Sequence, residues 1–214
     1  VNKIDMKYSL TTNARLFYYE DTAKKKKKKG LVYAKVFLYS HDAKNHDRIT
    51  NTANSFSQTF QGIKNLLKLN VSVEIVIKIL KQNVHELKDI ASFISKELKD
   101  IYRVRFSFVE PNSDKFEQIK IFKNLMPDFS YLSVELKEAM DILRKNNIYS
   151  FIEKMPICVC PKYYLDFEKV VPLTGSYKKP GSVCAKCKFF KNSYCIGENQ
   201  IYLKNTLGTQ ISKL

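Results

Sequence analysis

The ten residues VSVEIVIKIL, from Val71 to Leu80, decide the fold of this 214-residue chain. They are mostly apolar and rich in β-branched side chains, which is typical of a strand buried on both faces of a sheet. Only Glu74 and Lys78 are charged. The segments on either side, residues 55–69 and 84–99, carry apolar residues at helical spacing. The centre of the chain is therefore predicted to be a buried strand between two amphipathic helices.

The same alternation of strand and helix continues in both directions along the chain. Repeats of this kind predict a parallel sheet with right-handed crossovers, either open and doubly wound or part of a barrel. A loop is predicted from Ser40 to Asn54, with Ser55 as the N-cap of the helix that follows. In either architecture the functional site lies at the carboxyl ends of the strands. The further strands are predicted at residues 7–10, 32–39, 103–109 and 148–152, and the further helices at 15–29 and 133–146.

The chain is strongly basic, with a formal net charge of +16 from 37 lysines and arginines against 21 acidic residues. Nearly all of the cations are lysines, which lack the planar fork that arginine uses on phosphates and guanines. We therefore do not expect nucleic-acid binding, and the run Lys24–Lys29 is predicted to be solvated surface. No apolar run approaches the roughly 18 residues of a membrane helix, and no secretory signal is present, so a membrane role is not expected.

All five cysteines lie in the last third of the chain: Cys158, Cys160, Cys184, Cys187 and Cys195. Two thiols separated by two residues, a third eight residues later and a fourth from a distant segment can form a tetrahedral thiolate set. Such a set serves zinc or an iron–sulfur cluster. The alternatives are unlinked buried thiols, or a disulfide between Cys184 and Cys187. Cysteines without a secretory signal predict a reducing, cytoplasmic location.

Polar residues follow most of the predicted strands, at the edge where a ligand would bind. They are Thr12-Asn13, Ser40-His41-Asp42, Asn83 and Glu110–Asn112. Turn residues are polar in most proteins, so each of these has a structural explanation as well. No glycine-rich phosphate-binding motif is present, which leaves a nucleotide-binding Rossmann domain without support.

Taken in order, these segments resemble the middle and C-terminal part of a radical S-adenosylmethionine enzyme. The segments that carry the resemblance are LTTN (10–13), VFLYSHD (36–42), Ser55-Phe56, GIKNL (62–66), Val73–Ile79 with Asn83, and the tail Cys158, Cys184-x2-Cys187-x7-Cys195. The resemblance covers nearly the whole chain.

The resemblance implies a partial (βα)6 barrel, that is, a partial TIM barrel, over residues 1–153. A small cysteine-rich extension that binds a metal or an iron–sulfur cluster follows at residues 154–214. The chain departs from the family at two points. It lacks the Cys-x3-Cys-x2-Cys loop of the catalytic cluster, and Ala14 stands where the family tends to have glycine. Because the chain begins with Val1 near the family's third strand, we expect a fragment rather than a relative that has lost catalysis.

The resemblance also implies roles for individual residues. Asn13, Ser40, Lys78 and Asn83 correspond to positions that contact S-adenosylmethionine. Cys184, Cys187 and Cys195, with Cys158 preferred over Cys160, correspond to the ligands of an auxiliary [4Fe–4S] cluster. The expected partners are an electron donor such as ferredoxin or flavodoxin, and a substrate, peptide or small molecule, that the sequence does not identify. The alternative is a non-enzymatic α/β binding protein whose tail is a structural four-cysteine zinc site.

Overall fold

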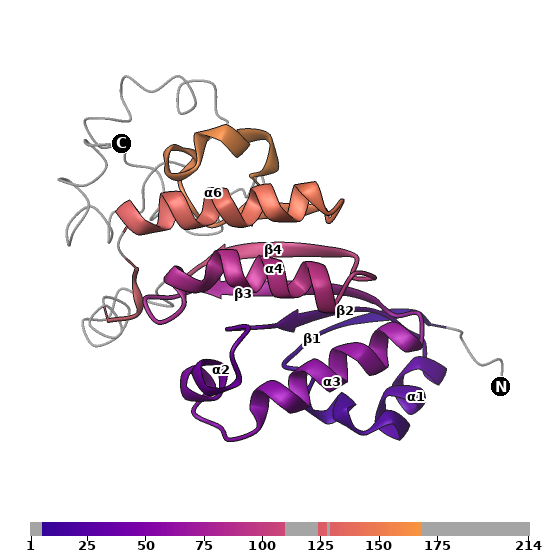
Figure 1. Ribbon diagram of the computed structural model, residues 1–214. Helices are drawn as coiled ribbons and strands as arrows, with labels where there is room; N and C mark the ends of the chain where they lie inside the picture. The colour runs from indigo at the N-terminus through magenta and orange to yellow at the C-terminus, as the bar shows by residue number, and fades with distance from the viewer. Residues whose placement is uncertain (1–5, 110–123, 128, 168–214) are drawn as a thin grey trace, which may run out of the picture.

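The computed structural model describes residues 6–109, 124–127 and 129–167. Within these residues the chain forms a five-stranded parallel sheet in which neighbouring strands are consecutive in the sequence. Figure 1 shows the sheet with its covering helices. The α/β fold with parallel βα repeats is thereby confirmed, and it agrees with part of a barrel. The strands are β1 (Tyr8–Thr12), β2 (Leu31–Phe37), β3 (Ser72–Ile79), β4 (Arg103–Phe108) and β5 (Ser150–Glu153).

The helices that connect the strands lie along one face of the sheet (Figure 1). This follows from the topology, because right-handed crossovers between consecutive neighbours all return on the same side. The connecting helices are α1 (Glu20–Lys28), preceded by the 3-10 turn η1 (Arg15–Tyr18), α3 (Ser55–Lys68), α4 (Leu87–Glu97), preceded by η2 (Val84–Glu86), and α6 (Phe129–Lys145). The remaining described helices are α2 (Ala43–Thr50), η3 (Ile157–Val159) and η4 (Pro161–Asp166).

The two faces of the sheet differ sharply in polarity. Alternate residues of β3 and β4, such as Ile75, Ile77 and Phe106, are fully buried in the core beneath the helices. The residues between them point to the opposite face because side chains alternate along a strand. That second face, which would be the interior of a barrel, carries Lys35, Glu74, Lys78, Arg103, Arg105, Ser107 and Glu153.

The loop predicted from Ser40 to Asn54 is wrong, because this segment contains helix α2. The helix begins after Asp42, whose side chain accepts a hydrogen bond from the Asn45 amide at 2.8 Å. It is short and almost entirely polar, so its sequence has no apolar periodicity to reveal it. Figure 1 shows α2 beyond the carboxyl ends of the strands, apart from the layer formed by the other helices.

Several predicted helix boundaries also differ from the structure; the helix predicted over residues 133–146, for example, begins at Phe129. The N-cap of α3 is Asn54, in a left-handed conformation with φ 60°, and Ser55 is the first helical residue. The helix predicted over residues 15–29 is interrupted at Tyr19, whose extended backbone (φ −80°, ψ 109°) separates η1 from α1.

The turn after β1 packs directly on helix α3. Ala14, where the family that the sequence resembles tends to have glycine, keeps a left-handed backbone with φ 58° and is fully buried. Opposite it, a Cβ atom added to Gly62 would lie 2.2 Å from the Ala14 carbonyl oxygen. Helix and turn can therefore approach this closely only because residue 62 has no side chain.

Replacing Gly62 by alanine is expected to lower the free energy of unfolding by about 1–3 kcal/mol, the usual effect of overpacking a closed contact. Urea denaturation of the two proteins measures the difference. Ser57→Ala, at an exposed position of the same helix, is the matched control and should change stability by less than about 0.5 kcal/mol. Equal stability of Gly62→Ala and the parent would contradict this description of the contact.

The first described residues after the sheet join its core. Met155, Val159, Cys160 and Tyr163 are buried and belong to the same hydrophobic cluster as the strands. The boundary predicted between residues 153 and 154 stays a prediction, because residues 168–214 lie outside the described part. No helix among the described residues is both long and apolar enough to cross a membrane.

Candidate functional site

Ser40, which follows β2, is one of two predicted cofactor contacts that the structure brings together. Its side chain is fully buried. The hydroxyl donates a hydrogen bond to Glu86 and accepts one from the Asp42 amide at 3.0 Å. Ser40 therefore fixes the turn between β2 and α2 and links it to the start of the helical segment after β3.

Asn83 is the second of these residues, and it joins the ends of β2 and β3. Its Nδ2 atom donates to the carbonyl oxygens of Tyr39 at 2.8 Å and Lys78 at 2.9 Å. Its Oδ1 atom accepts from the Leu80 amide at 2.8 Å. The side chain of Asn83 is buried, and its donors and its acceptor all bind backbone groups. Asn83 therefore holds the carboxyl ends of β2 and β3 in position.

Glu86 connects the groups at this edge, and the sequence analysis missed it. Its two carboxylate oxygens bind Ser40 and the Nδ2 atom of Asn45, the latter at 2.6 Å. The Nδ1 atom of His41 lies 3.7 Å from Glu86 Oε2. The side chains of His41 and Glu86 remain 34% and 25% exposed, so a ligand can reach both of them. The sequence feature that could have pointed to Glu86 is its position three residues after Asn83, a predicted site residue.

Lys78 lies on the inner face of the sheet, one residue before the end of β3. Its Nζ atom donates to Ser107 Oγ at 2.6 Å, and the register aligns Ser107 in turn with Glu153. This row is the last on the inner face before the carboxyl ends of the strands. Lys78 is partly exposed, and it lies next to the candidate site on the inner face of the sheet.

Deeper on the same face lies a buried ion network centred on Glu74, which is fully buried. Glu74 accepts hydrogen bonds from Tyr33, Arg105 and Arg103, the last at 2.5 Å. Arg105 also binds Glu153. Burial alone would raise the pKa of Glu74, but the hydrogen bonds from Arg105, Tyr33 and Arg103 hold that pKa below its usual value. The inner face therefore carries a charge network whose centre, Glu74, is shielded from solvent.

Asn13 lies at the end of β1 and is not joined to the Ser40–Glu86–Asn83 group by any hydrogen bond among the described residues. Its Oδ1 atom accepts from the Arg15 amide at 3.2 Å, and its carbonyl oxygen accepts from Thr59 at 2.9 Å. These contacts shape the turn that packs on α3. Asn13 remains a predicted contact of the cofactor, at the same edge of the sheet.

His46 of α2 is buried behind this edge, with an exposed fraction of 1%. Its Nδ1 atom is 3.0 Å from Ser55 Oγ, and its ring makes edge-to-face contacts with Tyr39 and Phe56. Nε2 has no hydrogen-bond partner in the described structure. Burial lowers the pKa of His46 to about 4, opposed in part by the Asp47 carboxylate, so the ring is neutral at pH 7.

Of the predicted thiolate ligands, only Cys158 lies within the described residues; Cys184, Cys187 and Cys195 lie outside them. Cys158 is partly exposed, whereas Cys160 is buried. Burial raises the pKa of the Cys160 thiol to about 11. Among the described residues, no group of three or more His, Cys, Asp or Glu side chains is arranged to hold a metal ion.

Comparison with known proteins reveals a likeness in fold. No family model and no curated protein sequence matches the chain. Among solved structures, Streptococcus suis SuiB bound to S-adenosylmethionine is similar over 74% of this chain and 36% of that protein, with a TM-score of 0.55 and 15% identity. SuiB bound to its precursor peptide SuiA gives a TM-score of 0.54 with 14% identity, over 74% of this chain and 34% of that one. The chain thus spans about a third of these proteins, and the likeness shows a shared fold.

Proposed function

We propose that this chain is the C-terminal portion of a radical S-adenosylmethionine enzyme, with the cofactor at the carboxyl edge of the sheet. One observation carries the proposal: consecutive parallel strands with helices on one face and charged groups on the other, a fold shared with a protein bound to S-adenosylmethionine. In parallel α/β folds of this kind, ligands bind beyond the carboxyl ends of the strands.

The accessible groups at this edge suit the chemistry of S-adenosylmethionine. The Glu86 carboxylate can accept hydrogen bonds from ribose hydroxyls, and the Lys78 ammonium can pair with the carboxylate of the methionine part. Ser40 and Asn83, whose polar atoms are bound within the protein, would hold the edge in shape around them. When bound beside a reduced cluster with an open iron, the cofactor supplies a 5′-deoxyadenosyl radical. In this proposal the three thiolates of that cluster lie outside the 214 residues.

We assign the auxiliary cluster of the tail to Cys158, Cys184, Cys187 and Cys195. The described cysteines support the choice of Cys158 over Cys160. Cys158 is partly exposed and can meet cysteines from another segment, whereas Cys160 is buried in the core cluster. An electron donor such as ferredoxin or flavodoxin would supply reducing equivalents. The precursor peptide bound to SuiB favours a polypeptide substrate over a small molecule.

Replacing Cys187 by serine is expected to abolish iron binding by the tail and to leave the sheet and its helices folded. The measurement is iron and acid-labile sulfide per chain after anaerobic reconstitution, with circular dichroism as the check on folding. Cys160→Ser is the matched control and should keep its iron. Full iron content in Cys187→Ser would contradict the ligand assignment. If the parent protein bound zinc and no sulfide, the tail would hold a structural zinc site instead of an iron–sulfur cluster.

A further inference from the structure

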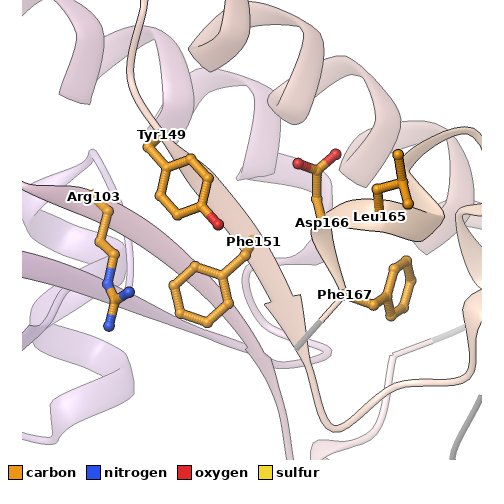
Figure 2. A pocket seen from close by; sticks show the side chains of 6 residues that line it. All are labelled: Arg103, Tyr149, Phe151, Leu165, Asp166 and Phe167. Carbon is orange, nitrogen blue, oxygen red and sulfur yellow. The ribbon is translucent and has the colours of Figure 1, made fainter. Parts of the chain in front are cut away.

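A pocket of about 160 Å³ opens beside the amino ends of β4 and β5 (Figure 2). We propose that it binds a single aromatic ring that carries a carboxylate, with the carboxylate on Arg103. The pocket is far along the strands from the carboxyl edge, since Arg103 is the first residue of β4. The inference therefore stands independently of the proposed function. The pocket is lined by Arg103, Tyr149, Phe151, Leu165, Asp166 and Phe167.

The size and the sides of the pocket fit one ring. A cavity of about 150 Å³ lined by apolar side chains accommodates benzene. Here Tyr149 and Phe151 stack on each other with ring centroids 6.2 Å apart. Phe167 also lines the pocket, and its segment forms a parallel β-bridge with Ile152 of β5, so its backbone is fixed beside that strand.

Apolar surface at this pocket is unusually open to solvent. Leu165 is 78% exposed and Tyr149 is 60% exposed. A ring that entered between them would remove apolar area from water on both sides. An aromatic ligand that bound at this opening would therefore gain free energy by burying apolar surface that the described residues leave exposed.

Arg103 supplies the polar half of the site. Its Nε atom donates to Glu74 at 2.5 Å and its Nη2 atom donates to the Tyr33 hydroxyl at 3.3 Å. A guanidinium has five N–H donors, and the described residues take up no others on Arg103. The group is held over the rings of Phe151 and Tyr102, at 4.8 and 5.2 Å from their centroids, so it is already oriented. Arginine in this arrangement recognises a carboxylate through paired hydrogen bonds.

The other charges near the pocket do not oppose an anion. The Asp166 carboxylate accepts a hydrogen bond from Arg144 at 2.9 Å, which offsets its charge. Arg105 lies 4.1 Å from the Phe151 ring centroid and adds positive potential behind it. Its own partners, Glu74 and Glu153, are buried on the inner face. The remaining N–H donors of Arg103 therefore favour a ligand with a negative charge.

Isothermal titration of the full chain with phenylacetate and with phenylacetamide tests the proposal. The two probes have the same ring and nearly the same shape, and they differ in the negative charge. We expect phenylacetate to bind at least tenfold more tightly. Two peptides that end in phenylalanine, one with a free and one with an amidated C-terminus, distinguish the source of the ligand. Tighter binding of the free-ended peptide than of phenylacetate identifies a chain terminus, and weaker binding identifies a free aromatic acid. Equal affinity for acid and amide, or no binding of any probe, would overturn the inference.

Substitutions at Leu165 test whether the ligand binds in this pocket. Because Leu165 is highly exposed, they should not disturb folding. Leu165→Asp puts a negative charge at the rim and should weaken phenylacetate binding about fivefold to tenfold, whereas Leu165→Lys should not weaken it. Val134→Asp, at a residue of α6 that is 58% exposed, is the matched control for an added acidic group and should bind as the parent does. If Leu165→Asp and Val134→Asp bound equally well, the ligand would not lie in this pocket.

Discussion

Replacement of Glu74 by alanine is expected to lower the free energy of unfolding by about 3–5 kcal/mol, the cost of removing one partner from a buried ion network. Glu74 is fully buried and accepts hydrogen bonds from two arginines and a tyrosine. Without it, the guanidinium of Arg105, itself 5% exposed, loses one of its carboxylate partners. The loss of a partner from a buried charge is what makes the substitution costly.

The matched control is Glu97→Ala. Glu97 also pairs with a basic residue, Lys64 at 3.8 Å, but both side chains are more than 40% exposed. Exposed ion pairs contribute about 0–1 kcal/mol, so the control should unfold at nearly the same urea concentration as the parent. If the two variants lost similar amounts of free energy of unfolding, Glu74 would be hydrated like Glu97, and the buried ion network around Glu74 would be contradicted.

The second large effect concerns pH. The chain is expected to lose about 3 kcal/mol of stability as the pH falls from 6.5 to 4, because of His46. In the unfolded chain this histidine has its ordinary pKa of 6.5, whereas burial lowers the pKa to about 4 in the folded chain. Between these values the unfolded state binds a proton that the folded state excludes. Acid therefore favours unfolding, and the stabilisation is complete only above pH 6.5.

Urea denaturation at pH 7.5 and pH 4.5 measures this contribution when the parent is compared with His46→Phe. Phenylalanine retains an aromatic ring between Tyr39 and Phe56. Ser55 keeps hydrogen bonds to Asp47 and Thr50, so the change leaves no new unpaired group there. Neighbouring Asp47 titrates in both proteins, and the difference between them isolates the histidine. His85→Phe, at an exposed position, should retain the full pH dependence; a parent-like slope in His46→Phe would contradict the buried neutral ring.

The strands and most of the helices were predictable from the sequence because their apolar residues follow the period of each element. Val71–Leu80 is the clearest case, and β3 occupies residues 72–79 of it. Helix α2 was not predictable in this way. It lies at the end of the sheet and is stabilised by the Asp42 cap and by polar contacts, so it needs no apolar stripe.

The candidate site was predictable only in part. Ser40 and Asn83 were predicted because they follow strands, and Lys78 was predicted through the family resemblance, but Glu86 looks like any acidic residue in the first turn of a helix. The two arginine partners of Glu74 are 29 and 31 residues away in the sequence. Only the register of β3 against β4 brings them together. The pattern of apolar residues predicts which face of a strand is buried, but it does not predict which charged residues of neighbouring strands meet on the opposite face.

The most direct test of the proposed function is the fate of S-adenosylmethionine. The protein would be purified anaerobically from its native source, as the full polypeptide made there, and reduced with dithionite in the presence of the cofactor. The proposal predicts that 5′-deoxyadenosine and methionine form in equal amounts and depend on the reductant. An iron-loaded protein that binds S-adenosylmethionine and yields no 5′-deoxyadenosine would contradict it, and would leave the fold as the only feature shared with the radical enzymes.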